Sequence, residues 1–430
     1  MYGERYSDVE KDLIERAAQV MPGGGFGNFA ADIVLARGKG GRVWDESGNE
    51  YVDFLLGSGP MLVGHNHPDV LAAVERQLPN GVTFFANNAQ GIQLAEAICD
   101  AVACADKLRF VSTGSEADMY AMRLARAHRG RDKILKFEGG YHGMSESSLM
   151  SLAPKRLVNF PMAVPDSAGI PAAVSDNILV APFNDAEVAR QLISEYADEL
   201  AGVIVEPFQR LMPPEPGFLE CLREETERHG IVLIFDEVVT GFRFAYGGAQ
   251  EVYGVTPDLC TLGKVIGGGF PLAAIAGKDE IMAHFDKDRV GEAGFTFQVG
   301  TLSGNPVASA AGLATLEILR RPGSYDRIQA TGRTIMQALE QNFARVGIPV
   351  QVIGHPSLFD IVFTDRPVRN YRDFLVGDTV RMKRFNTLLR QRGILKPDSK
   401  FYMSLAHDEA DIAQTVDAIR FAADTMKSEL

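Results

Sequence analysis

Two residues in the second half of the chain have the types and spacing for chemistry on a bound cofactor. The apolar run IVLIF at 231–235 ends on the acidic pair Asp236 and Glu237, and Lys264 follows inside the glycine-rich segment LGKVIGGG. The run predicts a buried strand whose end carries the carboxylate. A lysine amine can form a Schiff base with an aldehyde, and a carboxylate can keep a pyridine nitrogen protonated. The pair therefore predicts chemistry on pyridoxal phosphate.

The acidic strand alone also fits a nucleotide hydrolase, in which such a carboxylate holds magnesium. That alternative requires a phosphate loop of the form G-x-x-x-x-G-K-[ST]. At Lys264 the first glycine position is Asp258 and the residue after the lysine is Val265, and the Gly-Lys pair at 277–278 has Leu272 at that position. The glycines around Lys264 instead favour a lysine in contact with a ligand, because glycine lets the backbone approach a ligand closely.

The segment VSTGSEADMY predicts a phosphate site at the start of a helix. A strand ending at Ser112 runs into Thr113, Gly114 and Ser115, after which apolar residues recur at helical spacing. Free backbone N–H groups and the positive end of the helix dipole attract a phosphate, and the hydroxyls add donors. Taken alone, the segment also fits an ordinary helix N-cap.

Aromatic and histidine residues add two further candidate sites. Tyr141 and His142 lie between glycines in FEGGYHGMS, directly after the predicted strand ILKFE, where an aromatic ring can stack on a planar cofactor or pack in the core. His65 and His67 in GHNHP have the spacing of a metal-ligand pair, but no third or fourth ligand follows at a suitable distance. We predict no metal site.

Composition excludes several classes of partner. The 430 residues are 46% hydrophobic and 23% charged, with 43 basic against 56 acidic residues and a net charge of -13. Such a field repels nucleic acid and anionic membranes, so we expect neither as a partner. Cys99, Cys104, Cys221 and Cys260 show no C-x-x-C spacing, and the N-terminus lacks a signal-peptide core. We predict a cytoplasmic protein.

The order of elements predicts an α/β fold with two domains. Residues 7–20 have helical periodicity, and the segment from residue 42 predicts a hairpin outside the main sheet. From about residue 68, strands alternate with amphipathic helices, which is typical of a mostly parallel sheet. After residue 304 come a long helical stretch, strands of a second sheet and a closing helix. We predict a large domain at 66–305 and a smaller α+β domain built from 1–65 and 306–430.

Taken together, the motifs resemble those of class III aminotransferases, which are fold type I pyridoxal phosphate enzymes. Within that group the chain is most similar to glutamate-1-semialdehyde aminomutase and its relatives. The matching motifs run in order along nearly the whole chain: MPGG at Met21, RVWDESGNEYVD at Arg42, GHNHP at Gly64, TGSEA at Thr113, KFEGGYHG at Lys136, VIVEP at Val203, FDEVVTGFR at Phe235, PDLCTLGKVIGGGFP at Pro257 and GTLSGNP at Gly300.

The resemblance implies a role for each matching position. Lys264 would be the Schiff-base lysine and proton shuttle, and Asp236 the partner of the pyridinium nitrogen. Val238 and Tyr141 would pack on the two ring faces. Thr301 would reach the phosphate from the neighbouring subunit, which implies a homodimer. The remaining cofactor-binding positions implied are Thr113, Gly114, Ser115, His142, Glu206 and Gly300.

Departures from the aminomutase pattern lie in the predicted substrate pocket. Ala30 stands where the family has an arginine that holds the substrate carboxylate, Ser58 replaces a tryptophan, and the loop within the segment PDSKFYMSLAH at 397–407 is shortened. We therefore predict an aminotransferase that moves an amino group from an amino acid or amine donor to a keto or aldehyde acceptor in a ping-pong cycle. An aminomutase-type isomerase is the alternative. A cofactor-binding relative without catalysis would not need Lys264.

Three residues are candidates for contacting the substrate. Arg210, which follows the VIVEP motif, can grip a carboxylate bidentately, although a structural ion pair is the other interpretation. Phe26 in the entrance loop suggests a substrate with apolar or aromatic bulk, and Ser58 would line the same pocket.

Overall fold

The computed structural model describes residues 6–429, which form two compact units. Within the described residues, the terminal unit comprises residues 6–68, 326–365 and 377–429, and the central unit comprises Asp69–Tyr325 and Arg366–Val376. The sequence places the second boundary at residue 305, whereas the chain leaves the central unit only after Tyr325.

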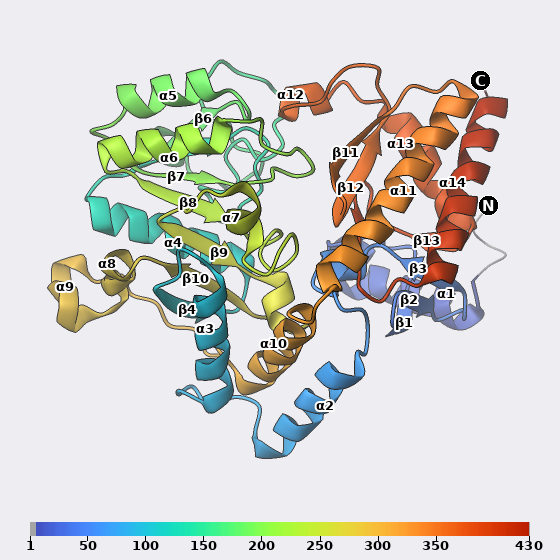
Figure 1. Cartoon of the computed structure of the whole chain (residues 1–430), viewed down its shortest axis with the longest axis horizontal. Coiled ribbons are helices and arrows are strands. Elements are labelled where there is room, and N and C mark those ends of the chain that lie inside the picture. The colour runs from blue at the N-terminus through green and yellow to red at the C-terminus, as the bar shows by residue number, and fades with distance from the viewer. Residues whose placement is uncertain (1–5, 430) are drawn as a thin grey trace. The chain divides into compact units, whose positions relative to one another are not determined.

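A seven-stranded sheet lies at the centre of the central unit, in the order β4-β10-β9-β8-β7-β5-β6 (Figure 1). Neighbours from β9 to β6 are parallel, whereas β10 is antiparallel to both β9 and β4. The strands are β4 (Lys107–Val111), β5 (Lys133–Phe137), β6 (Ile178–Ala181), β7 (Leu200–Val205), β8 (Val232–Asp236), β9 (Leu259–Leu262) and β10 (Ala273–Gly277). This mixed, mostly parallel sheet confirms the predicted α/β fold.

Helices cover the sheet, so its inner strands are buried on both faces. Every residue of β7 and β8 is buried, which explains why both strands are continuous apolar runs rather than alternating ones. The helical segments of this unit are α2 (Pro68–Gln77), η3 (Leu78–Asn80), α3 (Ala89–Ala101), α4 (Gly114–Arg129), η4 (Ala172–Asn177), α5 (Ala186–Glu195), α6 (Phe218–His229), α7 (Gly248–Tyr253), η5 (Lys264–Gly267), α8 (Asp279–Met282), η6 (Ala283–Phe285), α9 (Lys287–Gly294), α10 (Pro306–Leu319) and α12 (Tyr371–Phe374).

The terminal unit contains two smaller sheets. In the first, the predicted hairpin is present as antiparallel β2 and β3, and β3 also pairs in parallel with β13. Its strands are β1 (Leu35–Lys39), β2 (Arg42–Asp45), β3 (Glu50–Asp53) and β13 (Ile394–Leu395); the second sheet has β11 (Gln351–His355), β12 (Leu358–Val362) and β14 (Phe401–Tyr402). The helical segments are α1 (Asp8–Val20), η1 (Pro22–Gly24), η2 (Leu56–Ser58), most of α11 (Ser324–Val346), α13 (Thr379–Gln391) and α14 (Glu409–Ser428).

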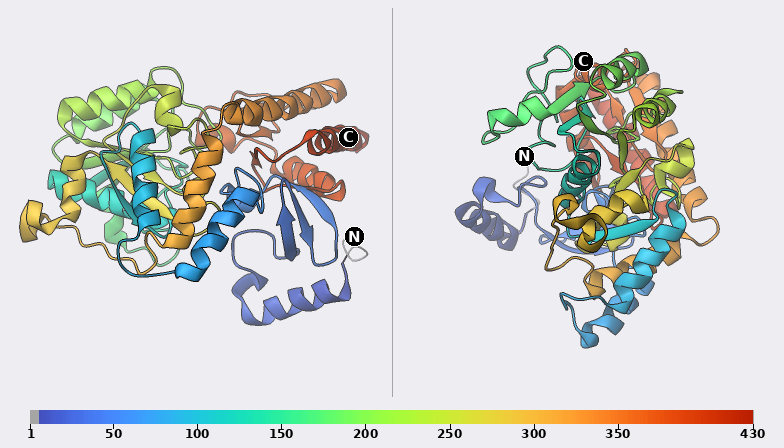
Figure 2. Two further views of the ribbon diagram at one scale, coloured as in Figure 1. Left: turned by 60° about the horizontal axis from the view of Figure 1, so that its bottom comes forward. Right: turned by 90° about the vertical axis from the view of Figure 1, so that its left-hand side faces the viewer.

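A buried carboxylate attaches α1 to the first of these sheets. Glu10 accepts hydrogen bonds from the N–H of Val34 at 2.9 Å and from the hydroxyl of Ser47. The helix that carries it runs below the strands of this sheet (Figure 2, left). Between residues 6 and 429, no helix is both long enough and apolar enough to cross a bilayer.

A glycine in α10 allows this helix to approach the turn that carries Lys264. α10 packs against both α3 and η5 (Figures 1 and 2). A Cβ atom on Gly312 would lie 2.0 Å from the carbonyl oxygen of Ile266 in η5. This approach is the reason α10 belongs to the central unit.

We expect Gly312→Ala to destabilise the protein, although alanine is the better helix former. The added methyl group must push α10 and η5 apart, which costs about 1–3 kcal/mol, whereas propensity alone would stabilise by about 1 kcal/mol. Urea unfolding measures the difference. An unfolding free energy of Gly312→Ala equal to that of the wild type would contradict the close approach of α10 to η5.

Candidate active site

The direction of the strands brings the predicted site residues to one edge of the central sheet. Because β10 is antiparallel to both β4 and β9, strands β4, β5, β7, β8 and β9 all run the same way and end at the same edge. Ligands of α/β proteins bind at this edge. The segments that begin there carry Gly114 and Ser115, Tyr141 and His142, Glu206, Asp236, and Lys264.

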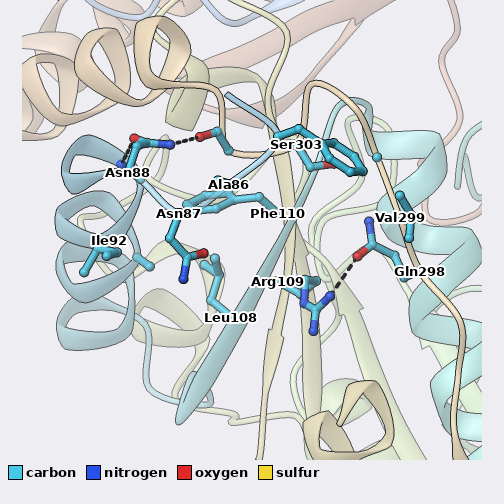
Figure 3. Close-up of a pocket in the computed structure, with 15 residues that line it drawn as sticks. Ala86, Asn87, Asn88, Ile92, Leu108, Arg109, Phe110, Gln298, Val299 and Ser303 are labelled. Carbon is cyan, nitrogen blue, oxygen red and sulfur yellow. Dashed lines mark hydrogen bonds between the residues drawn. The ribbon is translucent and has the colours of Figure 1, made fainter. Parts of the chain in front are cut away.

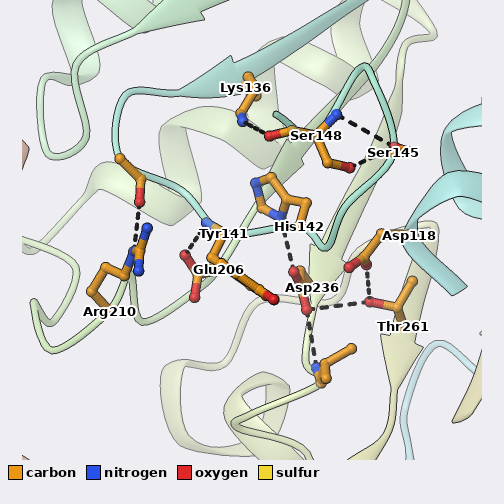
Figure 4. A network of polar contacts seen from close by, with 12 residues as sticks. Asp118, Lys136, Tyr141, His142, Ser145, Ser148, Glu206, Arg210, Asp236 and Thr261 are labelled. Atoms are coloured by element: carbon orange, nitrogen blue, oxygen red, sulfur yellow. Dashed lines mark hydrogen bonds and ion pairs between the residues drawn. The ribbon is translucent and has the colours of Figure 1, made fainter. Parts of the chain in front are cut away.

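Asp236, the last residue of β8, is held in the interior by two nitrogen atoms (Figure 4). Its side chain is 4% exposed and that of His142 is 1% exposed. Oδ2 lies 2.8 Å from Nδ1 of His142, and Oδ1 accepts the N–H of Val238 at 3.1 Å. His142 is thus the partner of the Asp236 carboxylate. Its other ring nitrogen, Nε2, is buried and has no hydrogen-bond partner within residues 6–429.

Lys264 is the first residue of η5 and follows β9 after Gly263. Its φ of +46° lies in the left-handed region, which costs a non-glycine residue about 1–3 kcal/mol. Backbone strain of this kind gathers at functional sites, where the surrounding packing holds it. The turn therefore presents Lys264 in a conformation that ordinary packing would not select.

Val238 packs between two glycines from different segments. A Cβ on Gly114 would lie 2.9 Å from Cγ1 of Val238, and one on Gly263 would lie 3.2 Å from the same atom. A larger residue at Gly114 would have to displace Val238. The two glycines therefore bring the start of α4, the end of β8 and the Lys264 turn together around one side chain.

The start of α4 is a capping box. The Thr113 hydroxyl accepts the N–H of Glu116 at 3.2 Å, while the Glu116 carboxylate accepts the N–H groups of Thr113 at 2.8 Å and Ser112 at 3.0 Å. The amides of Gly114 and Ser115 face outward from the first turn and can bind an anion. Thr113 thus orders the helix start through its cap.

The loop after β5 closes over this helix start. A Cβ on Gly143 would lie 2.5 Å from Cα of Ser115, so the loop passes directly over the first turn of α4. The N–H of Tyr141 donates to Glu206 at 2.8 Å, and Tyr141 as a whole is 39% exposed. Part of this residue is therefore accessible to a ligand.

Two basic side chains hold the same loop through its backbone carbonyls. Lys136 is buried in β5 and its Nζ donates to the carbonyls of Ser148 and Met150, each at 2.7 Å. Arg210 donates from Nε to Gly139 at 2.7 Å and from Nη2 to Leu152 at 3.1 Å, and its guanidinium carbon lies 5.5 Å from the centre of the Tyr141 ring.

The remaining candidates lie elsewhere. Gly300 and the exposed Thr301 lie in the segment before α10, and Gly300 lines a cavity of about 520 Å³. Phe26 and Ser58 belong to the terminal unit: Phe26 is exposed after η1, and Ser58 ends η2 with a φ of +65°.

Sequence reasoning missed a buried polar pair beside Asp236. The Thr261 hydroxyl lies 2.6 Å from Oδ1 of Asp118 in α4 and 3.4 Å from Oδ1 of Asp236. The sequence does contain a signal for Asp118, because this charged residue adjoins the apolar stripe of Ala117 and Ala121 on the predicted buried face of the helix. Thr261, inside an apolar strand, gives no comparable signal.

Comparison with known proteins decides the family. The family described as Aminotransferase class-III matches residues 27–421. A glutamate-1-semialdehyde 2,1-aminomutase 2 from Brevibacillus brevis is 42% identical over 392 residues, which cover 90% of each chain. An omega-transaminase structure from Sphaerobacter thermophilus has a TM-score of 0.92 and 38% identity over 98% of both chains. A transaminase structure with bound pyridoxal phosphate has a TM-score of 0.90 and 29% identity over 99% of both chains.

The chain belongs to the class III aminotransferase family. The cofactor of this aminotransferase is pyridoxal 5'-phosphate, and the edge of the central sheet fits it. The groups at this edge are helix amides that can bind a phosphate, a buried carboxylate that can bind a ring nitrogen, a lysine that can bind an aldehyde, and a partly exposed aromatic residue that can pack on a ring. His142, which holds that carboxylate, has a second buried ring nitrogen, Nε2, without a hydrogen-bond partner among the described residues.

The buried Lys136 predicts a pH dependence for this aminotransferase. Burial, together with the Arg210 charge, lowers the pKa of Lys136 from 10.5 to about 7. Between these values unfolding takes up a proton, so Lys136 makes stability rise with pH. We expect the unfolding free energy of the wild type to rise relative to Lys136→Met by up to about 1.4 kcal/mol per pH unit above pH 7. Urea unfolding at several pH values measures this, and a pH-independent difference would contradict the buried neutral amine.

Proposed function

We propose that this protein is a pyridoxal-phosphate-dependent aminotransferase that moves an amino group from an amino acid or amine donor to a keto or aldehyde acceptor in two half-reactions. The observation that carries the proposal is the meeting of Asp236, Lys264 and the start of α4 at one sheet edge. Family membership supports it, since the family's reactions pass through this cofactor.

The role of each residue follows from its chemistry and place. Lys264 holds the cofactor covalently and moves the proton of the substrate carbon. Asp236, kept in position by His142, holds the proton on the ring nitrogen. Bound pyridoxal phosphate supplies a ring that accepts electrons from that carbon. Gly114 and Ser115 bind the phosphate through their amides, while Val238 and Tyr141 cover the ring faces.

The substrate side favours a transferase over an isomerase. Ala30, Ser58 and the shortened loop within 397–407 replace groups that the resemblance assigns to substrate retention in the aminomutase. The transaminase at 38% identity supports this choice. The relative named as an aminomutase, at 42% identity, keeps the isomerase as the second candidate.

We also propose a homodimer in which Thr301 reaches the neighbouring site. Support comes from the cavity before α10, which is lined by exposed apolar side chains from separate segments, Phe85, Ile92 and Val299 (Figure 3). Phe297 and Leu302 are exposed next to it. Clustered apolar exposure of this kind is typical of an interface between proteins.

We expect single amino donors to convert the bound cofactor stoichiometrically and to release a carbonyl product. Absorption spectroscopy follows the cofactor, and chromatography measures the product. Lys264→Ala should bind the cofactor without this conversion, because it lacks the proton-transferring amine. Rapid formation of 5-aminolevulinate from glutamate-1-semialdehyde, with no released keto product from any donor, would establish the isomerase instead.

We expect Arg210→Ala to raise the KM of amino acid donors about tenfold or more, because a charge-assisted bond to the substrate carboxylate is lost. With a donor amine that has no carboxylate, KM should stay within about twofold of wild type. Comparing a donor that has a carboxylate with one that lacks it separates two roles of Arg210. These are binding of the substrate carboxylate and support of the loop that carries Tyr141. Equal changes for both donors would assign Arg210 a structural role only.

A further inference from the structure

A second buried carboxylate lies beside Asp236 and has no role in the mechanism above. Asp118, on α4, is 2% exposed. One side-chain atom from each of Asp118, His142 and Asp236, either a carboxylate oxygen or a ring nitrogen, lies within 4.8 Å of the others. Two carboxylates this close in a dry site cannot both be ionised without a large electrostatic cost. The pair must therefore share one proton.

The hydrogen bonds indicate which carboxylate keeps the proton. Asp236 has two nitrogen partners, Nδ1 of His142 and the N–H of Val238, whereas the Asp118 carboxyl group faces two oxygen partners, the Thr261 hydroxyl and the Asp236 carboxylate itself (Figure 4). A hydroxyl has one proton, so Thr261 cannot donate fully to both carboxylates. If Asp118 is protonated, it donates to Thr261, which then donates to Asp236. Every group in this chain is then satisfied.

The surrounding charges agree with this assignment. Burial, and then the negative charge of Asp236, raise the pKa of Asp118 well above its ordinary value, and the Thr261 hydrogen bond only partly opposes them. β10, which packs on α4, is entirely apolar. The titratable groups around Asp118 are Asp236 on β8, Glu206 after β7, Lys136 on β5, Tyr141 and His142 in the loop after β5, and Lys264 at the same sheet edge.

We propose that Asp118 is a positioning residue that keeps its proton at pH values where an ordinary aspartate is ionised and, through Thr261, directs a hydrogen bond to Asp236, so that the pair carries a single negative charge located on Asp236. The inference rests on the proposed role of Asp236 toward the cofactor ring. In this arrangement the Asp118 carboxyl group fixes the charge of Asp236, the carboxylate that is proposed to hold the proton on the ring nitrogen.

Unfolding of the full-length protein without added cofactor tests the proton on Asp118. Above about pH 4, where an unfolded aspartate ionises, the folded wild type retains a proton that the unfolded chain releases. The unfolding free energy of the wild type therefore falls as the pH rises. Asp118→Asn has no carboxyl group at this position, so its unfolding free energy lacks this decrease. We expect the unfolding constant of the wild type, relative to Asp118→Asn, to rise up to about tenfold per pH unit from pH 4 to the raised pKa.

A matched control uses another buried aspartate of the central unit. Burial opposes ionisation of Asp258, but hydrogen bonds from Arg223 and Lys278 outweigh it and lower its pKa below the ordinary value. Folded Asp258 is therefore ionised wherever the unfolded aspartate is, and the ratio of the unfolding constants of wild type and Asp258→Asn should be constant from about pH 5 to about pH 8. A constant ratio for Asp118→Asn as well would overturn the proposal.

Cofactor binding tests the hydrogen-bond chain independently. Asparagine is neutral and keeps a donor, so Asp118→Asn should retain the absorption spectrum of the bound cofactor and its dissociation constant within about twofold. Asp118→Leu and Thr261→Val should each weaken binding about tenfold, with no further loss in the double variant. Equal loss of cofactor binding in Asp118→Asn and Asp118→Leu would overturn the proposed hydrogen-bond chain from Asp118 through Thr261 to Asp236.

Asp236→Asn tests the proposed function separately. Normal cofactor binding and an unaltered spectrum in this variant would overturn the proposed function, while the unfolding result would still decide whether Asp118 carries the proton.

Discussion

Much of the site depends on holding one carboxylate inside a dry interior. A buried ion loses several kcal/mol of hydration unless donors replace the water. For Asp236 the donors come from His142 and from the Val238 amide. The loop after β5 must therefore bring an imidazole to the end of β8, and the chain must turn immediately after the strand. Because Val238 then packs on Gly114, the same requirement also fixes the start of α4.

The loop after β5 is held largely by side chains from other segments. Lys136 and Arg210 donate to four of its carbonyl oxygens, and the segment Arg366–Val376 adds a further clamp. Arg372 binds Glu138 through two hydrogen bonds, at 2.7 and 3.0 Å. A Cβ on Gly139 would lie 2.5 Å from the Tyr371 ring. A segment from the last fifth of the sequence thus stabilises the loop that carries Tyr141.

The sequence predicts the fold class well because its signals are local. The apolar run at 231–235 and the strand–helix alternation report burial and period directly, and the α/β sheet follows from them. The TGSEA segment likewise predicts the helix start that the capping box of Thr113 and Glu116 then fixes. Contacts among distant segments leave no periodic signal. Arg372 with Glu138, and Asp118 with Thr261, each join segments more than a hundred residues apart, so only the folded chain reveals them.

The division between strand ends and loops explains why cofactor chemistry is easier to infer than substrate. Asp236, Lys264 and Gly114 lie at or directly after strands of one rigid sheet, where a shift of any one would disturb packing around Val238. Candidate substrate residues such as Phe26 and Ser58 lie in exposed segments, which tolerate replacement without loss of the core. Relatives with different named reactions, at 42% and 38% identity, fit this division. The sheet edge constrains how electrons and protons move, while the loops are free to change which molecule supplies them.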